Sequence, residues 1–146
     1  MYKHILLPTD GSALSEVAVD NGLRFAKFAG AKVTGFYVLV ERPPASFDDA
    51  PPASAAPPAH DAISRAEAEK FLGVIVQKAK SAGVQCETLA MAHASPHQAI
   101  IQAAAERGCD LIVMASHGRK GVTGELVGSE TARVITHCKI PVLVYR

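Results

Sequence analysis

A cluster of glycines late in the chain is the feature of the sequence that most suggests chemistry. Gly118, Gly121, Gly124 and Gly128 follow a short apolar run and precede a predicted helix that begins at Ser129. Glycine lets the backbone approach a ligand without a Cβ and adopt positive φ, so consecutive N–H groups can converge on an anion. The first turn of the helix would add unpaired N–H groups and the positive end of its dipole. The stretch therefore predicts a phosphate site, and a flexible linker is the alternative.

Basic side chains accompany these glycines. His117, Arg119 and Lys120 would offset the charge of a phosphate, although His117 could equally be a solvated loop residue. The stretch is not a P-loop, because G-x-x-x-x-G-K-[ST] is absent, and no G-x-G-x-x-G follows the first apolar run. A P-loop NTPase and a dinucleotide-binding domain are therefore disfavoured.

A second candidate for ligand contact follows the first apolar run, where the chain reads Pro8-Thr9-Asp10-Gly11-Ser12. Asp10 is the carboxylate that we expect to contact a ligand. It could instead be a turn residue that caps the first helix. Both roles are compatible, because Ser12 is itself a suitable cap.

Other reactive residues form no convincing constellation. His93 and His97 are four residues apart, but Pro96 begins a helix between them, so they do not share one helical face and we expect no metal site. No serine or cysteine nucleophile pattern occurs, and Gly11-Ser12 lacks the preceding glycine of a G-x-S-x-G turn. We therefore expect no catalytic residue of these types.

Composition limits the classes that remain. The 146 residues, 49% of them hydrophobic, fit one packed domain, and the formal charge of +1 gives no footprint for nucleic acid or an anionic membrane. Three cysteines, none in a C-x-x-C pair, suggest reduced thiols rather than disulfides or zinc. No signal peptide or apolar run of about 20 residues is apparent, and we expect a cytoplasmic protein.

Short apolar runs alternate with helical periodicity along the chain. Strands are predicted at His4–Pro8, Lys32–Val40, Val84–Ala92, Asp110–Ala115 and Pro141–Tyr145. Several runs are continuously apolar, as in strands that are buried on both faces of a parallel sheet. Strict alternation with helices predicts an α/β fold, an open five-stranded parallel sheet with helices on both faces. Ligands of such sheets bind beyond the carboxyl ends of the strands.

Helices are predicted over residues 13–29, 61–82, 96–107 and 129–138. Ser95, Pro96 and Gln98 resemble a capping box at the start of the third helix. The buried faces are expected to hold Leu14, Ala18, Phe25, Phe28 and Ala29 in the first helix, Ala68, Leu72, Ile75, Val76 and Ala79 in the second, and Thr131, Val134, Ile135 and Cys138 in the last.

One segment interrupts this order. Residues 42–59 contain six of the nine prolines and predict a long loop at the carboxyl edge of the sheet. The loop could be a lid over a ligand or a mobile surface segment.

Taken together, these features resemble the universal stress protein family over nearly the whole chain. Gly118, nine further residues and then Gly128-Ser129 resemble the family's ATP-binding signature G-2x-G-9x-G-[S/T], although its first glycine falls on Ala115 here. The opening run 5–12, Phe36-Tyr37-Val38 and the closing run 140–144 resemble the family's first, second and last strands.

The resemblance implies a Rossmann-like domain over residues 1–146 that binds ATP with Mg²⁺. By the family pattern, Asp10 would hydrogen-bond the adenine or ribose end, and Val38 would pack on and pair with adenine. The remaining implied contacts are Pro8 and Thr9 beside Asp10, Met114 and Ala115 at the floor, and Gly118, Gly128, Ser129, Glu130 and Thr131 around the phosphates. His117 and Arg119 join this nucleotide site because of their charge and their position in the glycine loop. The resemblance also implies a homodimer through the strand Pro141–Tyr145.

Glu130 fits this list least well, because a carboxylate repels a triphosphate unless it turns away or meets Mg²⁺. It could instead be a favourable acidic residue in the first turn of a helix.

Two other functions stay open. The chain could be a family member that binds no nucleotide and acts through protein contacts, as Ala115 would allow, or an adenylating ligase. The ATP-binding protein would act as a nucleotide-dependent signalling module, with slow hydrolysis at most.

Overall fold

The computed structural model of the chain describes residues 1–40, 57–118 and 127–146. The strands are β1 (His4–Pro8), β2 (Lys32–Val40), β3 (Cys86–His93), β4 (Leu111–Ala115) and β5 (Val142–Tyr145). The helices are α1 (Ala13–Ala29), α2 (Pro57–Ala82), α3 (Pro96–Glu106) and α4 (Ser129–His137).

The five strands form one parallel sheet in the order β3-β2-β1-β4-β5. This confirms the predicted α/β class. The chain moves outward from β1 to β2 and β3, then returns to β4 on the other side of β1. The crossover direction therefore changes between β1 and β4, and a crevice is expected at the carboxyl ends of these two strands.

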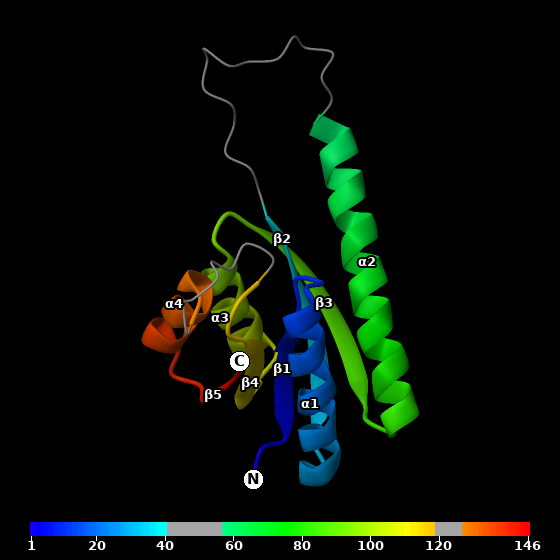
Figure 1. The fold of residues 1–146 in the computed structure, drawn as a ribbon, viewed down its shortest axis with the longest axis vertical. Coiled ribbons are helices and arrows are strands. Elements are labelled where there is room, and N and C mark those ends of the chain that lie inside the picture. The colour runs from blue at the N-terminus through cyan, green and yellow to red at the C-terminus, as the bar shows by residue number, and fades with distance from the viewer. Residues whose placement is uncertain (41–56, 119–126) are drawn as a thin grey trace.

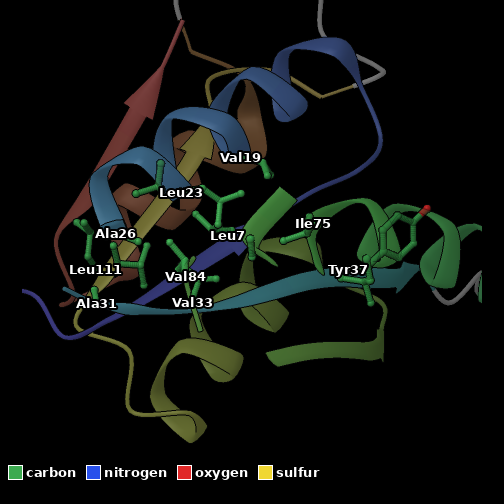
Figure 2. Close-up of a cluster of buried hydrophobic side chains, with 14 of the residues drawn as sticks. Leu7, Val19, Leu23, Ala26, Ala31, Val33, Tyr37, Ile75, Val84 and Leu111 are labelled. Atoms are coloured by element: carbon green, nitrogen blue, oxygen red, sulfur yellow. The ribbon is translucent and has the colours of Figure 1, made fainter. Parts of the chain in front are cut away.

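Helices cover both faces of the sheet (Figure 1). On one face, α1 and α2 pack on Ile5 and Leu7 of β1, and Figure 2 shows Leu7 beside Val19 and Leu23 of α1. On the other face, residues of α3 and α4 pack against Leu6. Neighbouring residues of β1 thus belong to opposite cores, which explains why the run is apolar at every position.

Two predicted element boundaries were wrong by more than one residue. β3 begins at Cys86 rather than Val84, because the Val84 N–H donates to the Ala79 carbonyl oxygen at 2.9 Å and so closes the end of α2. α2 begins at Pro57, so residues 57–59 are helical rather than part of the loop. Residues 41–56 lie outside the described residues, and with them the choice between a lid and a surface loop.

The capping box and parts of three helix faces were also wrong. Ser95 is the N-cap of α3, but its side chain makes no capping hydrogen bond. Phe28 is 85% exposed, and Val76 and Ile135 are also exposed. The buried side of α1 is instead formed by small and aliphatic residues, namely Ser15, Ala18, Val19, Gly22, Leu23 and Ala26.

Within the described part of the chain, no helix has both the length and the apolar character that crossing a bilayer requires.

Candidate functional site

A pocket of about 570 Å³ opens at the carboxyl edge of the sheet, at the change of direction between β1 and β4. Its size is typical of a small-molecule site. Of the residues predicted to contact a ligand, four lie outside the described residues, namely Arg119, Lys120, Gly121 and Gly124. The others all line the pocket. They are Pro8, Thr9, Asp10, Val38, Met114, Ala115, His117, Gly118, Gly128, Ser129, Glu130 and Thr131.

The turn after β1 holds Asp10 at this edge. The Ser12 N–H donates to Asp10 Oδ1 at 2.9 Å, and Gly11 has the positive φ of 79° that the turn requires. The Ser12 hydroxyl in turn accepts a hydrogen bond from the Ser15 N–H at 3.2 Å, which caps α1. Ser12 therefore caps the helix, and Asp10 orders the turn while its second oxygen, Oδ2, lies against Gly118.

Thr9 fixes the same turn from its other side. Its N–H donates to the Phe36 carbonyl oxygen at 2.9 Å, and its hydroxyl accepts a hydrogen bond from the Gly11 N–H at 3.1 Å. These bonds tie the end of β1 to β2, so the wall of the pocket is rigidly placed.

Gly118 and Gly128 are required by space rather than by φ. Neither has positive φ, which corrects the expectation from the sequence. A Cβ on Gly118 would collide with Asp10 Oδ2, and a Cβ on Gly128 would lie 2.9 Å from the Ser116 carbonyl oxygen. Gly118 lets the backbone approach the Asp10 carboxylate, and Gly128 lets the start of α4 approach the Ser116 backbone.

Ala115 occupies the position where the family signature has its first glycine. It is the last residue of β4, and no non-glycine residue in the described ranges has positive φ. Its carbonyl oxygen accepts a hydrogen bond from the buried Thr131 hydroxyl at 2.9 Å. Alanine is therefore unstrained here, and the departure from the signature leaves the geometry of the pocket intact.

The N-terminus of α4 faces the pocket. Gly128 is its N-cap, and the Gly128 N–H donates to the Ser116 carbonyl oxygen at 2.6 Å. No side chain caps this helix, and Ser129, Glu130 and Thr131 of its first turn line the pocket. The first N–H groups of a helix have no partner within it, so this end favours an anion.

Glu130 directs its carboxylate to α3 instead of the pocket centre. Its Oε2 accepts a hydrogen bond from the His97 N–H at 2.9 Å and lies 3.1 Å from His97 Nδ1, and its Oε1 accepts one from Arg133 at 2.9 Å. This geometry favours the alternative interpretation, in which Glu130 is a structural residue of the first turn. The Ser95 hydroxyl also contacts His97 Nδ1, at 3.0 Å. Because serine and glutamate share one ring nitrogen, this trio lacks the arrangement of a catalytic triad.

Sequence analysis missed several residues of the pocket. Phe36, Tyr37 and Val40 flank Val38 on β2, and they could have been found from the position of Val38 at the carboxyl end of its strand. Pro96 and Ile100 come from α3, whose place over the pocket depends on tertiary packing that no local pattern reveals. The complete set of missed residues is Ser15, Phe36, Tyr37, Val40, Pro96, Ile100 and Ser116.

Ser116 and His117 form a further hydrogen-bonded pair beside the glycines. Ser116 is fully buried, and its Oγ lies 2.8 Å from His117 Nδ1. His117 Nε2 is also buried and has no hydrogen-bond partner among the described residues. Within those residues, no group of three or more histidine, cysteine, aspartate or glutamate side chains could hold a metal ion.

Comparison with known proteins identifies the family of the chain. The model of the universal stress protein family matches residues 1–146. Universal stress protein MJ0531 of Methanocaldococcus jannaschii is 32% identical over 146 residues, which cover 100% of this chain and 83% of the relative.

Solved structures show the same fold. The structure of MJ0577 from the same organism has a TM-score of 0.80 at 28% identity and covers 99% of this chain and 95% of its own. A universal stress protein in complex with cAMP has a TM-score of 0.73 at 27% identity and covers 99% and 97%.

Proposed function

Because the chain belongs to the universal stress protein family, we propose that it binds ATP together with Mg²⁺ in the pocket at the carboxyl edge of its sheet. The observation that carries this proposal is the contact between Asp10 and Gly118, next to the uncapped start of α4. One ligand can therefore touch the turn after β1 and the first turn of α4 at once.

The residues present fit a nucleotide. Asp10, Pro8, Thr9 and Val38 would hold the adenosine end, while Gly118, Gly128, Ser129 and Thr131 would hold the phosphates through N–H groups and hydroxyls. The buried His117 Nε2, which has no hydrogen-bond partner among the described residues, is a polar atom that a ligand could satisfy. Mg²⁺ commonly arrives on the phosphates and keeps several waters, so this proposal requires no dedicated cluster of protein ligands for the metal.

Similarity to a nucleotide complex adds support. A structural relative of 27% identity is described in complex with cAMP, and its fold superimposes over 99% of this chain. ATP and cAMP share the adenosine moiety, so one pocket wall could serve either. The bound nucleotide would act as a signal in a stress response rather than as a rapidly consumed substrate, because we identify no nucleophile or base for its hydrolysis.

Calorimetric titration with ATP, with and without Mg²⁺, tests the proposal. We expect saturable binding at one site per chain, and weaker binding of GTP because Val38 and its neighbours would pair with adenine. Absence of saturable binding at millimolar ATP would overturn the proposal and favour the family member that acts without nucleotide.

We also propose that the protein is cytoplasmic, because its three cysteines are free thiols.

We propose in addition that the chain forms a homodimer through β5. β5 is an edge strand, and Leu143 is 38% exposed. An exposed edge presents unpaired backbone groups that a second copy could pair with. Sedimentation velocity should give the mass of a dimer, and Leu143→Glu should shift the protein to monomers. A monomeric wild-type protein at tens of micromolar would contradict this assembly.

A further inference from the structure

The hydrogen bond between Ser116 and His117 deepens the function proposed above, which used only His117 Nε2, an atom without a partner among the described residues. Ser116 has no exposed surface, and the only hydrogen-bond partner that the described residues offer its hydroxyl is His117 Nδ1, 2.8 Å away. The backbone on both sides of this hydroxyl is fixed as well. The Ser116 N–H donates to the Tyr145 carbonyl oxygen at 2.7 Å, and the Ser116 carbonyl oxygen accepts from the Gly128 N–H at 2.6 Å. The pair therefore sits in a rigid frame.

Hydrogen-bond satisfaction determines which nitrogen of His117 carries the proton. A buried hydroxyl hydrogen needs an acceptor, and His117 Nδ1 is the only one within reach of Ser116 Oγ in the described part of the chain. Ser116 therefore donates to Nδ1. In a neutral imidazole whose Nδ1 accepts, the proton is on Nε2, so Nε2 is a donor.

This donor is left without an acceptor beside the start of α4. Nε2 is buried and unpartnered among the described residues, and leaving a buried donor unpaired is costly. Cδ2, the ring carbon bonded to Nε2, lies 3.8 Å from the position that a Cβ would take on Gly128. The unpaired N–H thus belongs to the same corner of the pocket as the first-turn amides of α4.

We infer that His117 donates its Nε2–H to a phosphate oxygen of the nucleotide, and that Ser116 is a positioning residue that holds the imidazole in the tautomer able to do so. This inference rests on the proposed function and adds to it a side chain that helps the pocket to distinguish a nucleoside polyphosphate from a nucleoside. In this structure Nε2 is shielded from solvent, so the groups that cover it would have to move for the ligand to reach it.

Binding measurements on variants of His117 test the contact. We expect His117→Ala to lower the affinity for ATP about tenfold or more, which is the usual effect of losing one hydrogen bond to a charged group. The affinity for adenosine should stay within about twofold of the wild-type value. His117→Gln should restore much of the ATP affinity, because its amide N–H group can reach the place of Nε2–H. His137→Gln is the matched control, because His137 is an exposed histidine of α4.

Nitrogen NMR of the imidazole tests the tautomer independently of binding strength. Wild-type His117 should carry its proton on Nε2, and the Nε2 signal should shift when ATP is added but not when adenosine is added. Ser116→Ala should allow both tautomers and weaken ATP more than adenosine.

The outcomes separate this inference from the proposed function. If wild-type protein binds no nucleotide, the proposed function fails and the inference fails with it. If wild-type binds ATP and His117→Ala binds it equally well, or loses ATP and adenosine to the same degree, only the inference is overturned. A proton on Nδ1 in the wild-type protein would also overturn it, even if the alanine variant did not fold.

Discussion

The backbone at Gly118 touches the carboxylate of Asp10, and this contact joins two loops that are more than a hundred residues apart. Any side chain at position 118 would have to displace Asp10 Oδ2. Because Asp10 also accepts the Ser12 N–H that orders the turn before α1, the carboxylate cannot move freely. The requirement for glycine therefore comes from packing within the site itself.

A single methyl group at this position should disrupt the site. We predict that Gly118→Ala lowers ATP affinity at least about tenfold, because the new Cβ pushes Asp10 from its place and narrows the pocket. Calorimetric titration measures the loss, and the far-UV circular dichroism spectrum should be unchanged.

Gly73→Ala provides the matched control for this substitution. Gly73 lies within α2, and a Cβ there would meet nothing within 4 Å. Alanine at an exposed helix interior should stabilise the protein by about 0.5–1 kcal/mol and leave ATP binding unchanged. Equal ATP affinity for Gly118→Ala and Gly73→Ala would contradict the role of the contact with Asp10.

At the scale of elements, α4 supplies the cap that α3 lacks. The side chain of Ser95 makes no capping hydrogen bond, and its Oγ lies 3.0 Å from His97 Nδ1 instead. The His97 N–H in the first turn of α3 has no acceptor within its own helix, and it donates to Glu130 of α4 at 2.9 Å. A carboxylate at this end of a helix also interacts favourably with its dipole. The two helices that enclose one side of the pocket are therefore joined at their N-termini.

Removal of this cap should cost stability. We predict that Glu130→Ala lowers the free energy of unfolding by about 1 kcal/mol, because the half-buried first turn of α3 loses its acceptor. Urea unfolding measures the change, and Glu69→Ala, an exposed glutamate of α2, should change stability by less than half as much. If Glu130→Ala abolished ATP binding without a loss of stability, Glu130 would be a ligand contact rather than a cap.

Local pattern predicted the elements well and the helix faces poorly. All nine helices and strands of the described chain lie within a few residues of their predicted positions, because continuous apolar runs and glycine stops are local signals. The predicted face of α1 was partly wrong, because Ala18 is buried but Phe28 is exposed. The helix instead buries small residues, and a Cβ on Gly22 would lie 2.5 Å from Leu7 Cδ2. Close packing of a helix on a sheet decides this, and it depends on the partner strand.

In the candidate site, too, residues in local motifs could be predicted, whereas contacts that depend on the folded chain could not. Asp10, Gly118 and Gly128 could be predicted because they stand in short motifs at the ends of strands. The orientation of Glu130 toward α3 and the burial of Ser116 could not be, because both depend on contacts with His97, Tyr145 and Gly128 that form only in the folded chain.

At the scale of the whole molecule, the two edges of the sheet have different characters. The pocket lies at the carboxyl edge, whereas hydrogen-bonded polar side chains line the amino edge. The buried His4 donates from Nε2 to the Thr34 hydroxyl at 2.7 Å, and Thr34 donates to Glu87 at 3.1 Å. Arg107 lies 3.5 Å from Glu87, and Asp110 accepts the His4 N–H at 3.0 Å.

The protonation of His4 makes the stability of the folded protein depend on pH. Burial lowers the pKa of His4 below its ordinary value, and Lys32 lowers it further, while Glu87, the Arg107 backbone and Asp110 act in the opposite direction. The folded protein therefore holds His4 neutral at a pH where the unfolded chain has already taken up a proton. The stability that neutral His4 contributes is complete above about pH 6.5 and is lost as pH falls through that value toward the folded pKa.

His4→Gln should remove this pH dependence, because the amide can still donate to Thr34 but does not titrate in this range. Between pH 7 and pH 5, we predict that the free energy of unfolding falls more steeply in wild-type protein than in His4→Gln, by up to about 1.4 kcal/mol per pH unit for one proton. Urea unfolding across this range measures the slopes, and His137→Gln, which removes an exposed histidine, should keep the wild-type slope. Since the amino edge lies at the opposite end of the strands from the pocket, His4→Gln should bind ATP with wild-type affinity at pH 7. Equal slopes in wild-type and His4→Gln protein would show that His4 titrates alike in the folded and unfolded chains.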